Sequence, residues 1–229
     1  MVTKRGFIIT DPLDKTLLYS TAAEGWTLSA WELDPAETVT NYVDVPGRTA
    51  GPLDLSTALT DGRPTYGSRT LSVTLECSAG TRANRILKIK ELTRHTGYVR
   101  HITTPDDDKL HLVGRIIAVR QNYNDLAHAS VTLTAVCEPF KYSDTAREEI
   151  YHGTTVVAVQ VKNEGDVPVV PMIEVSNVSG SFELRVNDGE WQLIAGAYIL
   201  PGFVLKPGRT TVVMEGLADV KLTFTEAFL

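Results

Sequence analysis

The stretch Val43–Ser56, VDVPGRTAGPLDLS, combines two glycines, two prolines and one arginine, residue types that also build phosphate-binding loops. A nucleotide-binding loop requires G-x-x-x-x-G-K-[ST], in which backbone N–H groups and a lysine hold the phosphates. Gly47 and Gly51 have the wrong spacing for this pattern, and no lysine or expected helix follows them. We therefore expect a structural loop. The G-x-S-x-G turn of many serine hydrolases is also absent from the sequence.

Acidic residues and histidines are the other groups that could carry chemistry. Asp106, Asp107 and Asp108 are consecutive, so their carboxylates point in different directions and do not converge on a cation. We expect them at the solvated tip of a hairpin, across which His101 and His111 could face each other. The five histidines show no H-E-x-x-H spacing. The sequence thus predicts no catalytic residue, metal site or cofactor, and it does not support an enzyme such as a cell-wall hydrolase.

The two cysteines, Cys77 and Cys137, each end a run in which apolar and polar residues alternate. Parity places both thiols on the apolar face of a strand, where free cysteine behaves as a small hydrophobic residue. A disulfide is the alternative, but a cytosolic chain disfavours it. No histidine lies at zinc-ligand spacing from either residue.

Charge is distributed unevenly along the chain, whose formal net charge is −6. Residues 1–141 contain 16 basic and 16 acidic residues, whereas residues 142–229 contain 6 and 12. Neither part has the clustered basic patch of a dedicated nucleic-acid-binding domain, and no apolar run approaches the length of a membrane span. The N-terminus reaches Asp11 and Pro12 before any signal-peptide core develops. We expect synthesis in the cytosol, with no sequence-specific nucleic-acid or membrane partner.

Residues 81–97 are expected to form the only substantial helix, within a first domain otherwise made of strands. Thr81 can cap its start and Gly97 can end it. The apolar face is predicted to carry Ile86, Ile89 and Leu92. The polar face is predicted to carry Arg82, Arg85, Lys88 and Glu91. One amphipathic helix cannot bury its apolar stripe alone, so we expect it to lie across a sheet.

The remaining sequence reads as strands separated by turns at intervals of roughly ten residues, which is typical of an antiparallel sandwich. Asp188-Gly189 is expected in a hairpin turn. The predicted fold is mainly β. Residues 1–141 form an α+β domain with a sandwich-like sheet, one helix and a β-hairpin. Residues 142–152 form a linker, and residues 153–229 form an antiparallel β-sandwich.

The order of several short motifs resembles the distal tail proteins of phages with long non-contractile tails. VPGRTAG-LDLS is followed by Tyr66, by a strand that begins at Arg69, and then by a helix, a hairpin and the segment CEPFKYSD. In the second half, KNEGDVPVVPMIEV and LKPGRTTVVMEG are similar to the family's C-terminal motifs. The resemblance spans about the whole chain. The first loop has GRTAG where a shorter G-R-x-G is usual, and threonine stands where the family has asparagine after the last Pro-Gly.

The resemblance implies a structural role in a phage tail. Members form hexameric rings whose N-terminal domains surround the channel through which DNA leaves and whose C-terminal, galectin-like sandwiches project outward. The ring joins the tail tube to the tail-tip protein, and in some phages it holds receptor-binding proteins. The expected locations are therefore the tail tip of the virion and, during assembly, the host cytoplasm. A near-neutral first domain suits ring closure, because like charges on neighbouring copies would oppose it.

Residues for contact with a partner are predicted mainly in the opening loop and along the helix. Arg48 and Arg69 are the expected polar anchors, with hydrogen bonds inside the chain as the alternative role. The complete set of predicted interface residues is Pro46, Gly47, Arg48, Gly51, Asp54, Tyr66, Arg69, Arg82 and Arg85.

Two other functions compete with the ring-forming hub. A carbohydrate-binding module could hold sugar against Trp191 or Tyr198, although fold likeness to galectins does not confer sugar binding. A tail-tube subunit would form stacked tubes instead of a closed ring. A tail-derived bacteriocin would use the same subunit as an infectious phage.

Overall fold

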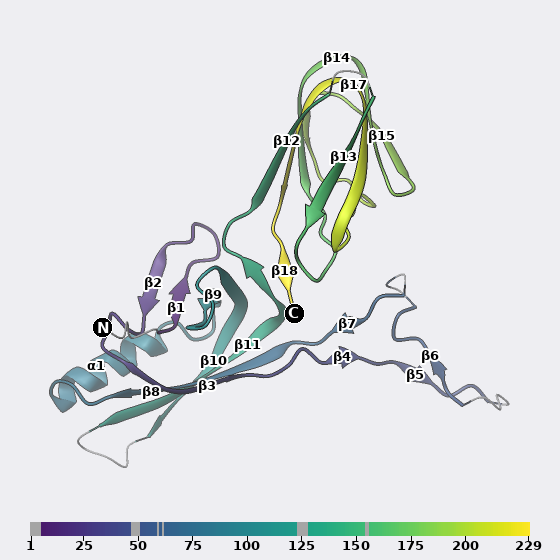
Figure 1. Cartoon of the computed structure of the whole chain (residues 1–229). Coiled ribbons are helices and arrows are strands. Elements are labelled where there is room, and N and C mark those ends of the chain that lie inside the picture. Colours follow the sequence, from purple (N-terminus) through teal and green to yellow (C-terminus); the bar gives the residue numbers. More distant parts are fainter. Residues whose placement is uncertain (1–5, 47–50, 59, 61, 123–127, 154–155) are drawn as a thin grey trace. The chain divides into compact units, whose positions relative to one another are not determined.

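The computed structural model describes residues 6–46, 51–58, 60, 62–122, 128–153 and 156–229. The chain divides into two compact units, Met1–Phe140 (unit 1) and Lys141–Leu229 (unit 2). Within these described residues the architecture is mainly β with one helix, as the sequence predicts (Figure 1).

Unit 1 is built on an antiparallel sheet whose strands follow the order β2-β1-β9-β10-β11-β8-β3. The strands up to the arm described below are β1 (Ile8–Thr10), β2 (Leu17–Ser20) and β3 (Thr27–Leu33). Those after it are β8 (Arg69–Cys77), β9 (Val99–Thr103), β10 (Leu110–Asn122) and β11 (Ala129–Ser143). Past Phe140, the end of β11 belongs to unit 2, where Lys141 and Tyr142 pair with β18 (Ala227–Phe228).

Alternation along β8 and β11 builds the centre of the unit 1 core. Leu75 lies opposite Val131 and Val73 opposite Leu133, and all four side chains are buried. Burial of each such side chain contributes roughly 1.5–3 kcal/mol relative to exposure. Both cysteines belong to the same core and are free thiols, which confirms the prediction.

Helix α1 (Arg82–Thr93) starts as expected, because the Asn84 N–H donates to Thr81 Oγ1 at 3.3 Å. It ends at Thr93, and Gly97 takes φ +84° after a further turn. The predicted faces are partly wrong. The buried face consists of Arg85, Ile89 and Leu92, whereas Ile86 is 40% exposed.

The physical reason is that two cations on the expected polar face have partners inside unit 1. The Arg85 guanidinium donates to the Gly80 carbonyl at 2.7 Å, and the Lys88 ammonium donates to the Glu24 carbonyl. Long basic side chains can pack their aliphatic stems against apolar surface while their charged ends remain hydrogen-bonded. The buried face is therefore rotated relative to the purely apolar stripe.

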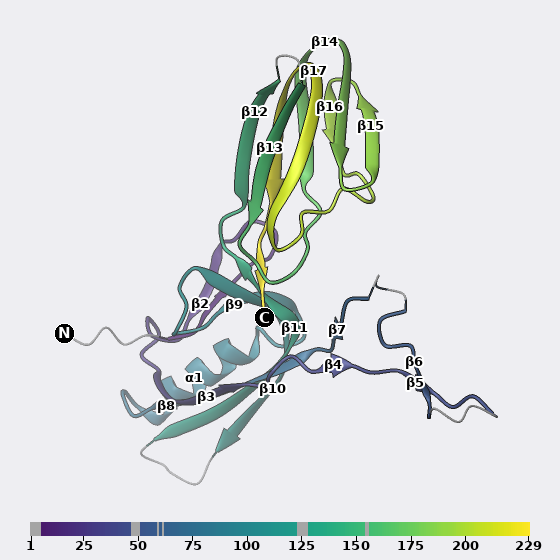
Figure 2. The same ribbon diagram turned by 45° about the vertical axis from the view of Figure 1, so that its right-hand side comes forward.

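Residues 34–68, here called the arm, separate β3 from β8 and form two short ribbons (Figures 1 and 2). The ribbon strands are β4 (Thr38–Val39) with β7 (Thr65–Tyr66), and β5 (Tyr42–Val43) with β6 (Leu53–Asp54). Nearly all their residues are exposed. Gly/Pro-rich loops were expected here, and within them four short strands pair to form the two ribbons.

Unit 2 is built on an antiparallel sheet of six strands, whereas β18 pairs with the end of β11 and so belongs to the other, eight-stranded sheet. The six strands are β12 (Arg147–Gly153), β13 (Val156–Asn163), β14 (Met172–Val186), β15 (Gly189–Leu193), β16 (Gly196–Tyr198) and β17 (Gly208–Phe224). Residues 142–152, expected as a linker, therefore include most of β12. Exposed residues, Ile150 among them, alternate with partly buried ones such as Arg147 and Tyr151 along this strand.

The unit 2 sheet folds on itself through its two longest strands. The first half of β17 pairs with β13 and the second half with β12, while β14 runs beside both halves. The bend falls at Gly216, whose φ is +109° and where a Cβ would lie 2.3 Å from the Ser181 carbonyl oxygen. The expected antiparallel β architecture is present, but as one continuous folded sheet instead of two separate sheets.

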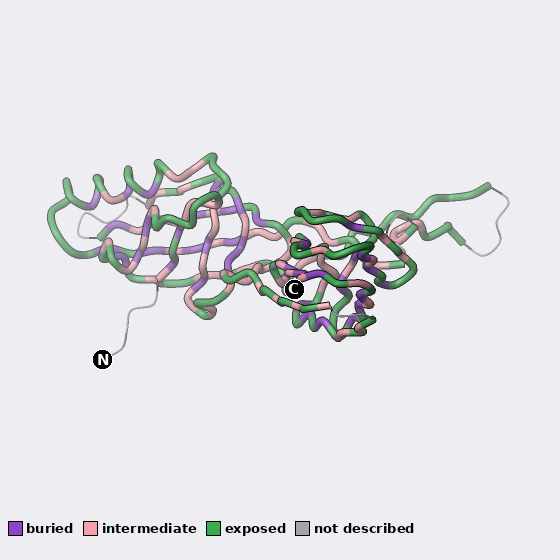
Figure 3. The backbone as a smooth tube through the Cα atoms, turned by 90° about the horizontal axis from the view of Figure 1, so that it is seen from above, coloured by how far each residue is buried: buried purple, intermediate pink, exposed green. Residues whose placement is uncertain are grey.

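Both halves of this sheet contribute to one core. Phe182 and Leu184 come from one half and Val220 and Leu222 from the other, and all are at most 1% exposed. Figure 3 shows buried segments alternating with exposed ones along the strands. The hairpin turn expected at Asp188-Gly189 lies one residue earlier, because Val186 pairs with Gly189.

Candidate interaction surfaces

The described residues contain no group of three or more His, Cys, Asp or Glu side chains placed to hold a metal ion. His101 and His111 stack across the β9–β10 hairpin, with ring centroids 4.0 Å apart, as their positions predict. Asp106–Asp108 lie in the turn of that hairpin, also as predicted. In the same described part of the chain, no helix is long and apolar enough to cross a membrane.

The arm exposes an unusual number of large apolar side chains. These are Val39, Tyr42, Val43, Val45 and Leu53, with exposed fractions between 37% and 59%. Val43 and Leu53 are direct cross-strand neighbours, so they form one apolar pair. Solvated apolar side chains on a narrow ribbon contribute little to its own stability, whereas burial against a partner would stabilise a complex.

Side-chain hydrogen bonds hold together the segments that flank β5 and β6 at residues 41 and 54–56. The Ser56 N–H donates to Asp54 Oδ1 at 2.9 Å, and the Asn41 N–H donates to Ser56 Oγ at 2.7 Å. The hydrogen bonds that Asp54 accepts from Ser56 lower the pKa of its carboxyl group. Asp54, predicted as an interface residue, thus holds the turn that follows β6.

The other predicted residues of the opening loop have different surroundings. Pro46 is exposed, and Gly51 has φ +79° with nothing within 4 Å of a Cβ placed on it. Gly47 and Arg48 lie outside the described residues. Whether this loop contacts a partner therefore stays a prediction.

Tyr66 and Arg69 anchor the base of the arm to the sheet of unit 1. The Tyr66 ring meets Phe140 edge to face, with ring centroids 5.7 Å apart. The Arg69 guanidinium donates to the Asp34 carbonyl at 2.7 Å and to the Pro139 carbonyl at 3.3 Å. Arg69 thus makes the hydrogen bonds inside the chain that were the alternative to an interface role. Of the two predicted helix residues, Arg82 is exposed and Arg85 is buried.

A shallow groove crosses the sheet of unit 1, and most of its exposed surface is apolar. Its lining comprises Ser68, Val99, Val113, Gly114, Arg115, Ile117, Val136, Cys137, Glu138 and Pro139. Val99, Ile117 and Val136 are 41%, 56% and 38% exposed. Sequence reasoning missed both this face and the apolar side chains of the arm. The available signal was the presence of large apolar residues at strand positions where alternation predicts polar ones.

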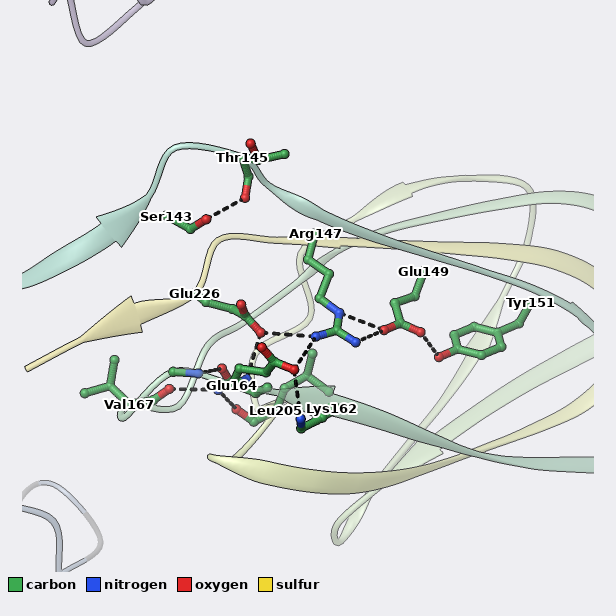
Figure 4. A network of polar contacts seen from close by, with 12 residues as sticks. Ser143, Thr145, Arg147, Glu149, Tyr151, Lys162, Glu164, Val167, Leu205 and Glu226 are labelled. Carbon is green, nitrogen blue, oxygen red and sulfur yellow. Dashed lines mark hydrogen bonds and ion pairs between the residues drawn. The ribbon is translucent and has the colours of Figure 1, made fainter. Parts of the chain in front are cut away.

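One ion-pair cluster lies at the start of unit 2, around Arg147 (Figure 4). Arg147 contacts Glu149 at 2.8 Å, Glu226 at 3.5 Å and Glu164 at 3.8 Å. Tyr151 donates to the other oxygen of Glu149 at 2.6 Å, and burial together with this hydrogen bond raises the pKa of Tyr151. The cluster connects β12 with the turn after β13 and with the segment that leads into β18.

The chain has the fold of a phage tail protein of known structure. It matches SPP1 Dit, described as a paradigm of the hub adsorption apparatus in phages that infect Gram-positive bacteria. The TM-score is 0.66 at 18% identity, and the match covers 96% of this chain and 98% of that chain. The resemblance predicted from the sequence is thereby confirmed at the level of the fold.

Two chains of the phage p2 baseplate in its activated conformation, one solved with strontium and one with calcium, also match. Their TM-scores are 0.47 and 0.44, each at 8% identity over 95% of this chain and 97% of that chain. No protein-family model and no curated protein matches the sequence.

Proposed function

We propose that this protein is the distal tail, or hub, protein of a long non-contractile phage tail or a related tail-like particle. The observation that carries the proposal is the structural match to SPP1 Dit, which extends over both units and nearly the full length of both chains. A match over a single sheet would support only a common β architecture, whereas both units in the same order support a common role. The role is structural and involves no catalysis.

In the proposed assembly, unit 1 forms a hexameric ring around a channel for DNA. The apolar side chains of the arm and the apolar groove of unit 1 are the surfaces that neighbouring copies would cover. Each copy in a ring uses two different surfaces, one toward each neighbour. An apolar ribbon and an apolar groove on the same unit supply such a pair.

The proposed partners are the tail-tube protein, the tail-tip protein and a receptor-binding protein, with the ring joining tube to tip. The protein would act at the tail tip of the virion after assembly in the host cytoplasm. Unit 2, proposed as galectin-like, would project outward. Its excess of acidic residues suits a solvated surface.

The surroundings of Trp191 and Tyr198 do not favour the alternative role in sugar binding. The Trp191 ring packs against Phe203, with centroids 5.9 Å apart, and lies over Gly189, where a Cβ would be 2.1 Å from it. The Tyr198 hydroxyl donates to the Ile194 carbonyl at 2.9 Å. Both aromatic rings pack against the core of unit 2, which leaves neither as an open platform for a sugar ring.

Negative-stain electron microscopy of the purified protein over a range of concentrations, combined with light scattering, tests the proposal. Closed rings with an open centre and a mass of six chains would support it. Stacked tubes would identify a tube subunit instead. If the chain stays monomeric both alone and with the tail-tube protein, the hub role is wrong.

A further inference from the structure

A second groove lies wholly within unit 2, on the outer face of its folded sheet. It has a volume of about 560 Å³, within the usual range for small-ligand sites. Its lining comprises Arg185, Val186, Asn187, Lys206, Arg209, Thr210, Thr211 and Val213. Arg185, Thr211 and Val213 alternate with buried residues of β14 and β17, so they stand on the face turned away from the core.

Two cations of unit 2 that no described carboxylate neutralises, Lys206 and Arg209, line the groove. Unit 2 carries seven basic and twelve acidic residues. Arg147, Lys162 and Lys221 each lie within 2.8 Å of a glutamate oxygen. By contrast, Lys206 and Arg209 are exposed, and neither has a carboxylate within 4 Å in the part of the chain that the structure describes. Two unpaired cations beside one concave surface repel each other unless an anion lies between them.

The two ends of the groove differ in charge, because carboxylates surround Arg185 at one end. Its guanidinium contacts Glu183, Glu215 at 3.3 Å and Glu190 at 3.6 Å, so its charge is already compensated. These carboxylates make that end of the groove unfavourable for an anion. An anionic group would therefore bind at the opposite end, beside Lys206 and Arg209.

A neutral donor lies next to these two cations on the outward face of β17. Thr211 Oγ1 accepts a hydrogen bond from Gln160 Nε2 at 2.7 Å, which leaves its hydroxyl proton available for donation. Thr210 is buried on the opposite face of the strand, where its Oγ1 accepts a hydrogen bond from the Lys206 N–H at 3.1 Å and holds the backbone beside the groove. Cations combined with hydroxyl donors suit the several oxygens of a phosphate group.

We propose that this groove binds the phosphate groups of a flexible polyol phosphodiester chain. None of the described lining residues is aromatic, so the groove offers no stacking surface for a nucleic-acid base or a neutral sugar ring. The open shape suits a chain that passes across the surface. The proposal goes beyond the hub role, and because the groove lies in one unit of one chain, binding does not depend on ring assembly.

The test is isothermal titration of the intact chain with three probes: poly(glycerol phosphate), inorganic phosphate and a neutral oligosaccharide. We expect binding of both phosphate probes, with the polymer at least roughly tenfold tighter because it presents many phosphates. If inorganic phosphate binds as tightly as the polymer, the groove is a site for the free ion, and the proposal of a polymer ligand is wrong. The logarithm of the polymer affinity should fall with the logarithm of salt concentration with a slope of about −1 to −2, as two phosphate contacts require.

The double variant Lys206→Gln, Arg209→Gln is expected to weaken polymer binding by roughly tenfold or more, because it removes both free cations. Lys221→Gln is the matched control, since it removes a cation of unit 2 that pairs with Glu148 outside the groove. Unchanged binding in the double variant overturns the proposal, as does an equal loss in the control. Equally tight binding of a single-stranded DNA oligomer or of the neutral oligosaccharide also overturns it.

Discussion

Replacement of the apolar pair on the arm should weaken self-association without unfolding the chain. Val43 and Leu53 lie opposite each other on β5 and β6 and are 40% and 37% exposed. Complete burial of such a side chain is worth roughly 1.5–3 kcal/mol, so covering the exposed fraction contributes about 1 kcal/mol for each residue. The double variant Val43→Ser, Leu53→Ser should therefore lose about 2 kcal/mol at each contact between copies.

An interface weakened by about 2 kcal/mol has a dissociation constant roughly 30-fold higher. Sedimentation velocity over a range of protein concentrations measures this as a shift of assembly to higher concentration. Thermal unfolding should change little, because both side chains lie outside the core of unit 1.

The matched control is Leu13→Ser, which removes an apolar side chain that is 94% exposed in the turn between β1 and β2. This control should assemble like the unmodified protein. Assembly of the arm variant at unchanged concentration would refute the reasoning, and so would an equal weakening in the control.

Three further predictions concern the stability of the separate units and the state of the thiols. Arg147→Met should lower the free energy of unfolding of unit 2 by about 1–2 kcal/mol at neutral pH, because it leaves partly buried carboxylates without their cation. Lys162 and then Arg147 lower the pKa of Glu164, so the loss of unfolding free energy caused by Arg147→Met should shrink as acid protonates the cluster. ¹⁹F NMR of a fluorotryptophan-labelled chain measures the unfolding of unit 2 separately through the signal of Trp191. An equal loss of unfolding free energy at neutral and acidic pH would contradict the explanation. Gly114→Ala should destabilise unit 1 by about 1–3 kcal/mol, because the added Cβ would lie 2.6 Å from Cys137 Sγ. An unchanged urea midpoint would contradict this, since it would show that β10 and β11 can move apart to accommodate the methyl group without loss of stability. Burial raises the pKa of the Cys137 thiol to about 11, so an aromatic disulfide reagent at pH 8 should modify it only after unfolding, and rapid reaction of the native protein would contradict its burial.

The cores of both units could be predicted well where alternation and side-chain size agree. Leu71, Val73 and Leu75 are buried as their parity requires, and the hairpin around Asp106–Asp108 lies where the turn residues place it. The helix was located correctly, but its buried face was not. Hydrophobicity selects Ile86, whereas the structure buries Arg85, whose hydrogen bond to Gly80 cannot be deduced from spacing.

The long strands of unit 2 show a second limit of sequence reasoning. Gly180 and Gly216 both have positive φ, a conformation that also occurs in the turns that end strands. Each lies instead within a strand that bends and continues along a new partner, in β14 and β17 respectively. A glycine that ends a strand and one that bends it satisfy the same local rule, and only the partner strands distinguish them.

The hydrogen bonds of unit 1 also change which residues should be targeted to disrupt assembly. Arg69, Arg85 and Lys88 each donate to a backbone carbonyl of their own chain, so a partner could recruit them only by breaking a hydrogen bond already made. The apolar side chains of the arm lose no such hydrogen bond on contact with a partner, and covering their exposed fraction is favourable. Substitutions at Val43 and Leu53 should therefore reduce assembly more, and unfold the chain less, than substitutions at Arg69 or Arg85.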